Sequence, residues 1–424
     1  MTASVIRMTY RIETGGDVAA LAQKIASDQS TGTFVPVPGE TPELKARVGA
    51  RVVAVRPLEP FKSPSFPQAR PGADGLFHRG EADIEFPLEA VGTDLAALTT
   101  IAIGGVWSIR GFSGVRIVDM KLPPEFGAAH PGPQFGVEGS RALTGVRGRP
   151  IIGTIVKPAL GLRPHETAEM VRELAEADVD FIKDDEKLMS PAYSSLEARV
   201  KAIMPILLER EQKSGRKVMY AFGISHADPD VMMRNHDIVA DAGGNAAVVN
   251  INSIGYGGFA YLRKRSRLVL HAHRNGWDIL TRHPGLGLDF RVYQQFWRLL
   301  GVDQFQINGI GAKYWEPDDS FVRSFQALCE PLFTPADRPL PVAGSGQWGG
   351  QAPQTYARTG ETVDLLYLCG GGVVSHPGGP AAGVRAVRQA WEAAVAGVAL
   401  ETYAKDHPEL AQSIVKFGGS GEAA

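Results

Sequence analysis

Two stretches decide the fold that this sequence predicts: IIGTIVK at residues 151–157 and VDFIKDDE at residues 179–186. Each is a short run rich in β-branched residues that ends in charged side chains, as expected where a buried strand leads into a loop. Similar runs recur at residues 217–223, 246–251, 268–273, 304–308, 340–343 and 365–369. The sequence therefore predicts eight strands after residue 150.

Helical patterns separate these strands. Met204, Leu207 and Leu208 have the i, i+3, i+4 spacing of an amphipathic helix. Further helical segments are expected at residues 228–242, 290–300, 321–328 and 381–403. Eight strand–helix units in about 250 residues match the size of a (β/α)8 (TIM) barrel. We assign this α/β barrel to residues 151–410; a doubly wound sheet is the alternative, but eight units would make it unusually large.

The residues before the barrel follow a different pattern. Apolar and polar residues alternate over 6–12, which predicts a half-buried strand, and Asp17 then resembles the N-cap of a helix. Strand-like segments follow at residues 51–55, 82–86 and 115–122, with a Pro/Gly-rich loop at 57–75. We predict a smaller α+β, ferredoxin-like domain over residues 1–122, a linker over 123–150 and a flexible tail over 411–424.

Composition excludes several classes of protein. The 424 residues carry 44 basic and 46 acidic side chains, so no overall charge favours nucleic acid or an anionic membrane. The only two cysteines, Cys329 and Cys369, exclude a disulfide scaffold and a four-cysteine zinc site. No apolar run reaches the roughly 18 residues of a membrane span, and the first 25 residues lack a signal-peptide core. We expect a soluble, cytoplasmic globular protein.

The end of the second strand carries the most informative cluster. In a barrel the active site lies at the carboxyl ends of the strands, and here Lys183, Asp185 and Glu186 close the run. Two carboxylates suit Mg2+, which prefers oxygen ligands. A bare ammonium would repel that cation, so the cluster forms a metal site if CO2 converts Lys183 into an anionic carbamate. The alternative is a solvated charged loop with one ion pair.

Other strand ends also carry candidate residues. Lys157 closes the first strand among apolar neighbours, where partial burial would lower its pKa toward the range of proton transfer, although such lysines often extend into water. His271, His273 and Arg274 close the fifth strand and suit anion binding or proton transfer, although a structural histidine is equally common.

Two glycine-rich loops follow the last two strands. They contain Ser345 and Gly346 after the seventh strand, and Gly370 and Gly371 after the eighth. Glycine lets backbone N–H groups approach a phosphate closely, and these two loops are the usual phosphate cradle of the fold. Glycine-rich loops are common, so their position supplies most of the signal.

Taken together, these segments resemble the large subunit of ribulose-bisphosphate carboxylase (RuBisCO) and its RuBisCO-like (form IV) relatives. The segment DFIKDDE at 180–186 is similar to the one that carries the carbamylated lysine and two magnesium carboxylates. Further similarity lies in KP at 157–158, HR at 273–274, GGG at 370–372 and STGT at 30–33, and it extends from about residue 5 to 405. The resemblance implies one Mg2+ per subunit held by Lys183, Asp185 and Glu186.

The same resemblance implies further roles and an assembly. Lys157 would transfer a proton, and His273, Arg274 and the two glycine-rich loops would bind substrate and phosphate. Thr33 lies in a loop that, in the family, reaches into the neighbouring subunit's active site. We therefore expect a homodimer or higher homo-oligomer with shared active sites, acting on a phosphorylated keto sugar or keto acid, with no nucleic-acid or membrane partner.

The departures from the family pattern argue against carbon fixation. Ala159 stands where carboxylases have a second lysine, Trp277 replaces a histidine, Asp28 replaces a glutamate and Gly105 replaces an asparagine. The sixth strand also lacks the family histidine, with Gln306 nearby. The following loop is shorter, so Lys313 is either the counterpart of the family's lysine there or an ordinary surface residue.

The retained residues favour an enzyme that stabilises an enolate with Mg2+. RuBisCO-like proteins include carbon–carbon lyases or hydrolases that act on 3-oxo-isoapionate 4-phosphate, by decarboxylation or by transcarboxylation and hydrolysis. Others are methionine-salvage enolases or isomerases acting on methylthio-pentulose phosphates. The resemblance implies that these enzymes use a lysine near the position of Gly105, which a glycine cannot replace, so we favour the first group. A non-catalytic binding protein is the third alternative, and the retained metal ligands argue against it.

Overall fold

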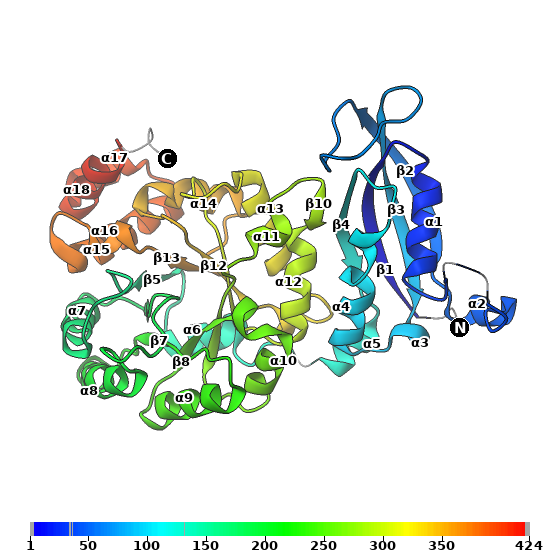
Figure 1. Ribbon diagram of the computed structural model, residues 1–424. Coiled ribbons are helices and arrows are strands. Elements are labelled where there is room, and N and C mark those ends of the chain that lie inside the picture. Colours follow the sequence, from blue (N-terminus) through cyan, green and yellow to red (C-terminus); the bar gives the residue numbers. More distant parts are fainter. Residues whose placement is uncertain (1–3, 34, 36, 131, 420–424) are drawn as a thin grey trace. The chain divides into compact units, whose positions relative to one another are not determined.

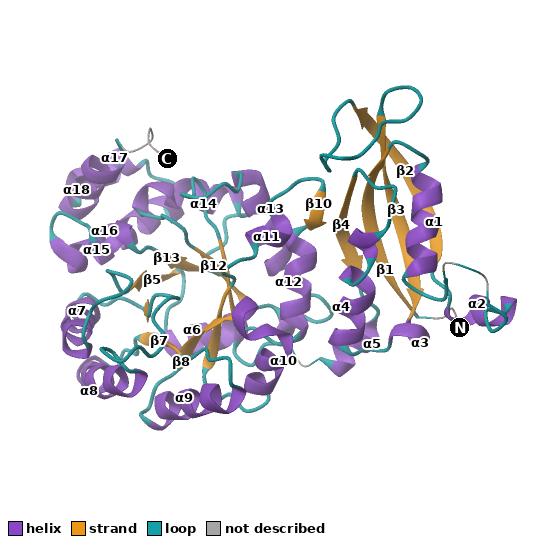
Figure 2. Ribbon diagram, viewed as in Figure 1, coloured by secondary structure: helices purple, strands orange, loops and turns teal. Residues whose placement is uncertain are grey.

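The computed structural model describes residues 4–33, 35, 37–130 and 132–419. The chain divides into two compact units. One comprises Met1–Pro131 with Gly276–Leu299, and the other comprises Gly132–Asn275 with Leu300–Ala424. Figure 1 follows both along the sequence, and Figure 2 distinguishes their helices and strands. In the parts of the chain that the structure describes, no helix combines the length and apolarity needed to cross a bilayer.

The second unit is a closed barrel of eight parallel strands, in the order β11-β12-β13-β5-β6-β7-β8-β9. The predicted (β/α)8 barrel is therefore confirmed. Each strand lies within one of the eight runs that the sequence predicts. The strands are β5 (Ile151–Ile155), β6 (Phe181–Lys183), β7 (Met219–Gly223), β8 (Ala246–Asn250), β9 (Val269–His273), β11 (Gln304–Ile307), β12 (Leu340–Ala343) and β13 (Leu366–Leu368).

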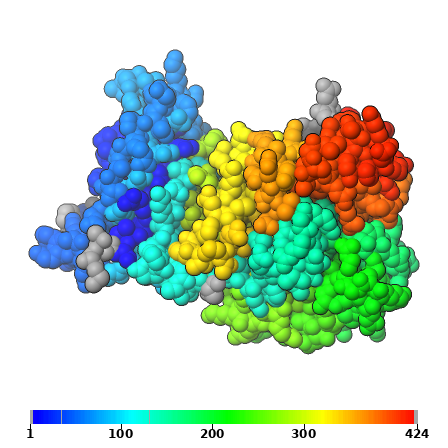
Figure 3. All heavy atoms as spheres, turned by 180° about the vertical axis from the view of Figure 1, so that it is seen from behind, coloured from blue at the N-terminus to red at the C-terminus, as the bar shows by residue number. Residues whose placement is uncertain are grey.

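Helices surround the barrel strands. α16 contacts α7, so the last long helix is a neighbour of the first one after β5. In Figure 3 the orange and red surface of the C-terminal helices adjoins the teal and green surface of the first barrel segments. The helices of this unit are α6 (Gly136–Thr144), α7 (Pro164–Glu176), α8 (Leu196–Ser214), α9 (Pro229–Asp241), α10 (Ile251–Arg263), α13 (Asp318–Cys329), α14 (Ala352–Arg358), α15 (Gly371–Val374), α16 (Gly379–Val395), α17 (Leu400–Tyr403) and α18 (Pro408–Phe417).

Side chains from the strands fill the barrel interior. Phe181, Met219, Val269 and Leu366 are among the residues of this core and are almost fully buried. A Cβ on Gly153 would lie about 3 Å from side-chain atoms of Phe181 and Leu366, so only glycine fits at that point of β5. The interior is thus a packed core, and the site must lie at a strand end.

The first unit is built on a five-stranded sheet in the order β10-β4-β1-β3-β2. The pairs β1–β3, β1–β4 and β2–β3 are antiparallel. With α1 after β1 and α4 before β4, this is the β-α-β-β-α-β order of a ferredoxin-like fold, so the predicted α+β domain is confirmed. Its elements are β1 (Val5–Thr14), α1 (Val18–Asp28), α2 (Pro42–Val48), β2 (Arg51–Phe61), β3 (Phe77–Pro87), α3 (Leu88–Val91), α4 (Leu95–Ile103), β4 (Gly114–Lys121), α5 (Pro124–Ala129), α11 (Asp278–Thr281), β10 (Leu286–Leu288) and α12 (Phe290–Leu299).

The structure differs from the sequence prediction at several boundaries. Residues 123–150, expected to be a linker, contain α5 and α6, because Phe126 and Val137 supply apolar side chains that are buried. The expected tail over 411–424 begins as part of α18, where Leu410 and Ser413 are buried; residues 420–424 lie outside the described residues.

A second difference concerns residues that the sequence pattern assigned to the barrel. Gly276–Leu299 belongs to the first unit, since β10 pairs in parallel with β4. β2 also continues through Phe61 into the predicted loop at 57–75. The Ala-rich segment 381–403 is two helices, because Gly397 takes a positive φ of 67° between α16 and α17.

Candidate active site

Adjacent strands bring the two lysines together at the carboxyl end of the barrel. Ile155 of β5 is paired with Lys183 of β6, and Lys157 follows two residues after Ile155. Lys157 Nζ lies 2.6 Å from Asp185 Oδ2. The parallel register thus joins residues that are 28 positions apart in the sequence into one charged cluster.

Lys183 is completely buried within this cluster. Its Nζ donates to the backbone carbonyl of Asp184 at 3.0 Å and to Glu186 Oε2 at 3.3 Å. Burial lowers the pKa of Lys183 below its usual range, while Glu186 and Asp185 oppose that shift. A lysine in this environment presents a neutral, nucleophilic amine at a lower pH than an exposed lysine does.

The two carboxylates beside Lys183 differ in exposure. The Asp185 side chain is 1% exposed and the Glu186 side chain is 24% exposed. Burial by itself would raise the pKa of Glu186, but the positive charges of Lys183 and His273 and the hydrogen bonds that Glu186 accepts together outweigh it, and the pKa falls to about 2. Asn250 Nδ2 donates to the backbone carbonyl of Glu186 at 2.8 Å and so holds this turn.

Asp184 lies in the same acidic run but has a different role. It is fully buried and accepts hydrogen bonds from Tyr220 Oη at 2.7 Å and from the backbone N–H of Gly223 at 3.0 Å. Arg199 Nη2 lies 3.2 Å from Asp184 Oδ2. Asp184 therefore anchors the loop after β6 and is not available to a ligand. The alternation of side chains along a strand already sets it apart from Lys183 and Asp185, which point to the same side.

The end of β9 faces the same cluster. His273 Nε2 lies 3.5 Å from Glu186 Oε2, and burial together with the charge of Lys183 lowers the pKa of His273 to about 3. His273 is thus neutral at physiological pH while Lys183 carries an unmodified amine. His271 is fully buried and bonds to Gln304 at 3.0 Å, a structural role within the barrel.

Arg274 is held by a residue that the sequence reasoning missed. Its guanidinium lies 3.8 Å from Glu316 Oε2, and Asn308 Nδ2 donates to the same oxygen at 2.6 Å. All three side chains are buried. Asn308 closes the run of β11, so it could have been found as Arg274 was, by its position at the carboxyl end of a predicted strand. Glu316 lies beyond the strand, and no sequence pattern indicated it.

The two glycine-rich loops lie next to these residues. Ser345 takes a φ of 69°, a left-handed conformation that is uncommon outside glycine. Lys313 N donates to the Ser345 carbonyl at 3.1 Å, and a Cβ on Gly346 would lie 3.1 Å from Lys313 Cβ. The structure therefore brings Lys313 to the loop after β12.

The loop after β13 borders the first strand. A Cβ on Gly370 would lie 3.5 Å from Lys157 Cε, so Gly370 adjoins the candidate proton-transfer lysine. A Cβ on Gly371 would meet open space, whereas one on Gly372 would lie 2.4 Å from the Gln347 carbonyl. Of the three glycines, Gly371 is thus the one whose backbone faces free space.

Thr33 belongs to the first unit, together with three of the four clear departures from the family pattern. Its hydroxyl donates to the Val35 carbonyl, and the residue is exposed. A Cβ on Gly105 would lie 2.9 Å from Gln29 Nε2, so a larger residue there requires Gln29 to move. Trp277 is buried against Phe290 in an edge-to-face contact.

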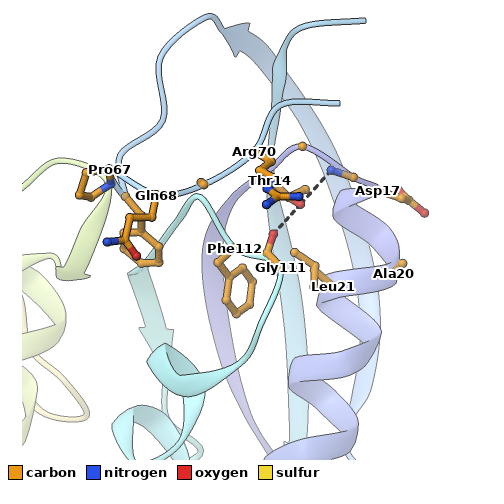
Figure 4. Close-up of a pocket in the computed structure, with 13 residues that line it drawn as sticks. Thr14, Asp17, Ala20, Leu21, Pro67, Gln68, Arg70, Gly111 and Phe112 are labelled. Carbon is orange, nitrogen blue, oxygen red and sulfur yellow. Dashed lines mark hydrogen bonds between the residues drawn. The ribbon is translucent and has the colours of Figure 1, made fainter. Parts of the chain in front are cut away.

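One cavity of the first unit contains none of the predicted site residues. It has a volume of about 810 Å3 and lies between the start of α1 and the segment 66–70 (Figure 4). Thr14 Oγ1 donates to the Gly111 carbonyl at 2.8 Å at its edge. Its lining side chains include no carboxylate–lysine cluster like that of the barrel.

The donors around Lys183 fit a magnesium ion only if the lysine itself becomes a ligand. Among the residues that the structure describes, no three His, Cys, Asp or Glu side chains form a metal-binding group. Asp185 and Glu186 supply two carboxylates, and a carbamate on Lys183 would supply a third oxygen donor. The Oδ1 atom of Asn250 and the Nδ1 atom of His273 are buried beside them and have no hydrogen-bond partner in the described part of the chain, as expected where a further group is bound.

Comparison with known families agrees with the fold. The family model for the ribulose bisphosphate carboxylase large chain, catalytic domain, matches residues 136–417, and the model for its N-terminal domain matches residues 3–126. This chain therefore belongs to the RuBisCO large-chain family.

Individual relatives are similar along almost the whole chain. A 3-oxo-isoapionate-4-phosphate decarboxylase of Rhizobium etli is 76% identical, with 97% of this chain and 99% of the relative covered. A 3-oxo-isoapionate-4-phosphate transcarboxylase/hydrolase of Xanthobacter autotrophicus is 44% identical, with 96% and 97% covered.

Two solved structures show the same relationship. The crystal structure of a rubisco-like protein from Burkholderia fungorum has a TM-score of 0.90 at 39% identity, covering 97% of this chain and 99% of that one. An octameric ribulose-1,5-bisphosphate carboxylase/oxygenase from Pyrococcus horikoshii has a TM-score of 0.87 at 29% identity, covering 98% and 94%.

Proposed function

We propose that this protein is a RuBisCO-like decarboxylase of 3-oxo-isoapionate 4-phosphate, a carbon–carbon lyase, and not a CO2-fixing carboxylase. The observation that carries the proposal is the 76% identity with the Rhizobium etli decarboxylase over 97% of this chain. The retained cluster of Lys157, Lys183, Asp185 and Glu186 agrees with it. The departures at Ala159 and Gly105 from the carboxylase pattern point the same way.

Lys183, Asp185 and Glu186 would hold one Mg2+ per subunit, with CO2 bound as a carbamate on Lys183. The buried amine of Lys183, with its lowered pKa, supports this assignment, because carbamylation requires the neutral amine. When bound, the ion withdraws electrons from the keto oxygen of the substrate and stabilises the negative charge that develops there.

Lys157 would hold and deliver the proton. Loss of the β-carboxylate as CO2 leaves the bonding electron pair on the neighbouring carbon as an enolate, and that carbon must then gain one proton. Lys157 Nζ, 2.6 Å from Asp185 Oδ2, stands beside the metal ligands and next to Gly370. These two contacts support the proposed role of Lys157 in proton transfer.

His273, Arg274, Ser345, Gly346, Gly370 and Gly371 would bind the substrate and its phosphate. Arg274 supplies a fixed positive charge, since Glu316 orients its guanidinium. Gly371 faces open space, where its backbone N–H can approach a phosphate oxygen.

Thr33 would complete the site of a neighbouring subunit in a homodimer or larger homo-oligomer. A matching carboxylase from Pyrococcus horikoshii is octameric, which supports assembly in this family. Sedimentation analysis together with activity assays tests this part, and full activity in a verified monomer would exclude it.

The main experiment follows the fate of the carboxyl carbon. The protein is incubated with Mg2+, bicarbonate and 3-oxo-isoapionate 4-phosphate in D2O, and products are followed by NMR. A decarboxylase releases that carbon as CO2 and leaves one deuterium on the neighbouring carbon. The similarity to the Xanthobacter autotrophicus protein makes transcarboxylation and hydrolysis the second candidate, and a product that retains the carboxyl carbon would select it.

A further inference from the structure

A cavity lined by charged side chains lies at the opposite end of the barrel from the Lys183 cluster. It has a volume of about 730 Å3 and is lined mainly by residues 142–149, by residues 215–217 and by Arg388. These segments precede β5 and β7, so the cavity lies at the amino ends of the strands, whereas Lys157 and Lys183 lie at the carboxyl ends. We refer to it as the basal cavity.

Five basic side chains line the basal cavity: Arg147, Arg149, Arg216, Lys217 and Arg388. Asp180 accepts hydrogen bonds from the two terminal nitrogens of Arg149 at 2.5 and 2.9 Å and lies 3.5 Å from Arg216. This buried carboxylate therefore neutralises Arg149 and leaves Arg216 with a weaker contact.

Other carboxylates near the basal cavity neutralise only part of its charge. Asp178 lies 3.5 Å from Arg216 and also pairs with Arg210. Glu138 lies 3.3 Å from Arg147, and Glu211 lies 3.3 Å from Lys217, both in largely exposed pairs that water screens. With Arg210 included, the cations outnumber their paired carboxylates by two.

Arg388 is one of the arginines that line the basal cavity. Its Nη2 donates to the Asp178 carbonyl at 2.5 Å, but its Nε is buried and has no partner among the described residues. Burial lowers the pKa of Arg388, and the neighbouring positive charges of Arg149 and Arg216 lower it further. The Arg388 side chain is only partly buried and lines the cavity together with Arg149 and Arg216, and three neighbouring guanidinium groups favour an anion in the adjacent space.

We propose that the basal cavity binds a doubly charged oxyanion, either inorganic phosphate or the phosphate group of a small phosphate ester. The cation excess of two matches the charge of a phosphate dianion. Guanidinium groups donate paired hydrogen bonds to phosphate oxygens. A cavity of about 730 Å3 is also large enough for more than the phosphate itself, since small-molecule pockets span roughly 300–1,000 Å3.

The alternative is that these cations only neutralise the carboxyl-terminal ends of α6 and α8, which end at Gly145 and Gly215 beside the cavity. That role needs no bound anion. Arg141 already donates to the carbonyls of Val146 and Arg149 after α6. Binding measurements separate the two interpretations.

The test is isothermal titration of the full chain with inorganic phosphate, and separately with ribose 5-phosphate, at low ionic strength. Two variants each remove one positive charge from α8 or from the loop after it. Arg216→Gln removes a side chain that lines the cavity, whereas Lys213→Gln removes one that pairs with exposed Glu209. Phosphate binding at the carboxyl end of the barrel is common to both variants, so any difference between them reports the basal cavity.

We expect Arg216→Gln to raise the phosphate dissociation constant of this site about tenfold, and Lys213→Gln to leave it unchanged. Added salt should weaken the same binding. Arg388→Gln provides a second variant, with its folding checked by circular dichroism. Identical isotherms for the wild-type, Arg216→Gln and Lys213→Gln proteins would overturn the proposal. Tighter binding of ribose 5-phosphate than of phosphate would show that the sugar occupies part of the cavity beside the phosphate.

Discussion

At the carboxyl end of the barrel, Lys183 and Asp185 are buried next to polar atoms of Asn250 and His273 that have no partner among the residues that the structure describes. At the amino end, Asp180 is equally buried, but Arg149 and the backbone N–H of Ile152 satisfy it. Both clusters belong to the segment around one short strand, β6. We infer that the ion pair at the amino end stabilises the fold, whereas the charged groups at the carboxyl end remain available to bind a ligand.

The largest expected effect comes from removing the lysine at the carboxyl end. Lys183→Ala should lower decarboxylation by at least about a thousandfold, because the third oxygen ligand of the ion is lost. The fold should persist, because the substitution removes a buried amine and leaves Arg149 at the amino end paired with Asp180. Steady-state assays and 13C NMR of the carbamate measure this.

Lys201→Ala is the matched control for that variant, because Lys201 is an exposed lysine of α8. It should keep full activity. Unchanged turnover in Lys183→Ala would refute the carbamate assignment.

The next effect contrasts two buried aspartates. Asp180→Asn should lower the free energy of unfolding by about 3–5 kcal/mol, because Arg149 then loses its buried partner. Asp185→Asn should lower activity more than a hundredfold but destabilise the fold by less than half as much. Urea denaturation and assays of both proteins measure the contrast. Equal destabilisation would remove the distinction between the two ends.

A smaller effect concerns pH. Because burial lowers the pKa of Lys183, half-maximal activation by CO2 should occur below the usual lysine value of about 10.4. The neutral amine is the reactive form, so activation rises with pH and is lost as pH falls. The protein is pre-incubated with CO2 and Mg2+ at different pH values and assayed at one pH. Activation that decreases with rising pH contradicts this mechanism.

The smallest effect distinguishes two neighbouring glycines at the carboxyl end. Gly371→Ala places a methyl group in open space at the phosphate loop, so we expect KM to rise several-fold with unchanged stability. Gly372→Ala places it 2.4 Å from the Gln347 carbonyl, so we expect a lower melting temperature. Thermal unfolding and substrate titration separate the two outcomes, and the same KM for Gly371→Ala and the wild type would argue against the phosphate role.

Much of the fold was predictable because β-branched runs and helical spacing are local properties. All eight barrel strands fall within the predicted runs. Residues such as Lys157 and His273 were found because parallel strands place their carboxyl ends at one rim. The assignment of Gly276–Leu299 to the first unit was not predictable, because β10 pairs with β4, more than 150 residues away in sequence.

The sequence by itself determined the barrel, the ferredoxin-like unit and the lysine–carboxylate segment 180–186, because short-range periodicity or a contiguous motif predicts each of them. Only the tertiary structure showed what each acid contacts: Asp184 is bonded to Tyr220 and Arg199, and Asp185 lies beside Lys157. Only it brought Arg388 to Asp178, 210 residues earlier. Burial and ion pairing depend on which distant side chains share a space, and no local pattern encodes that.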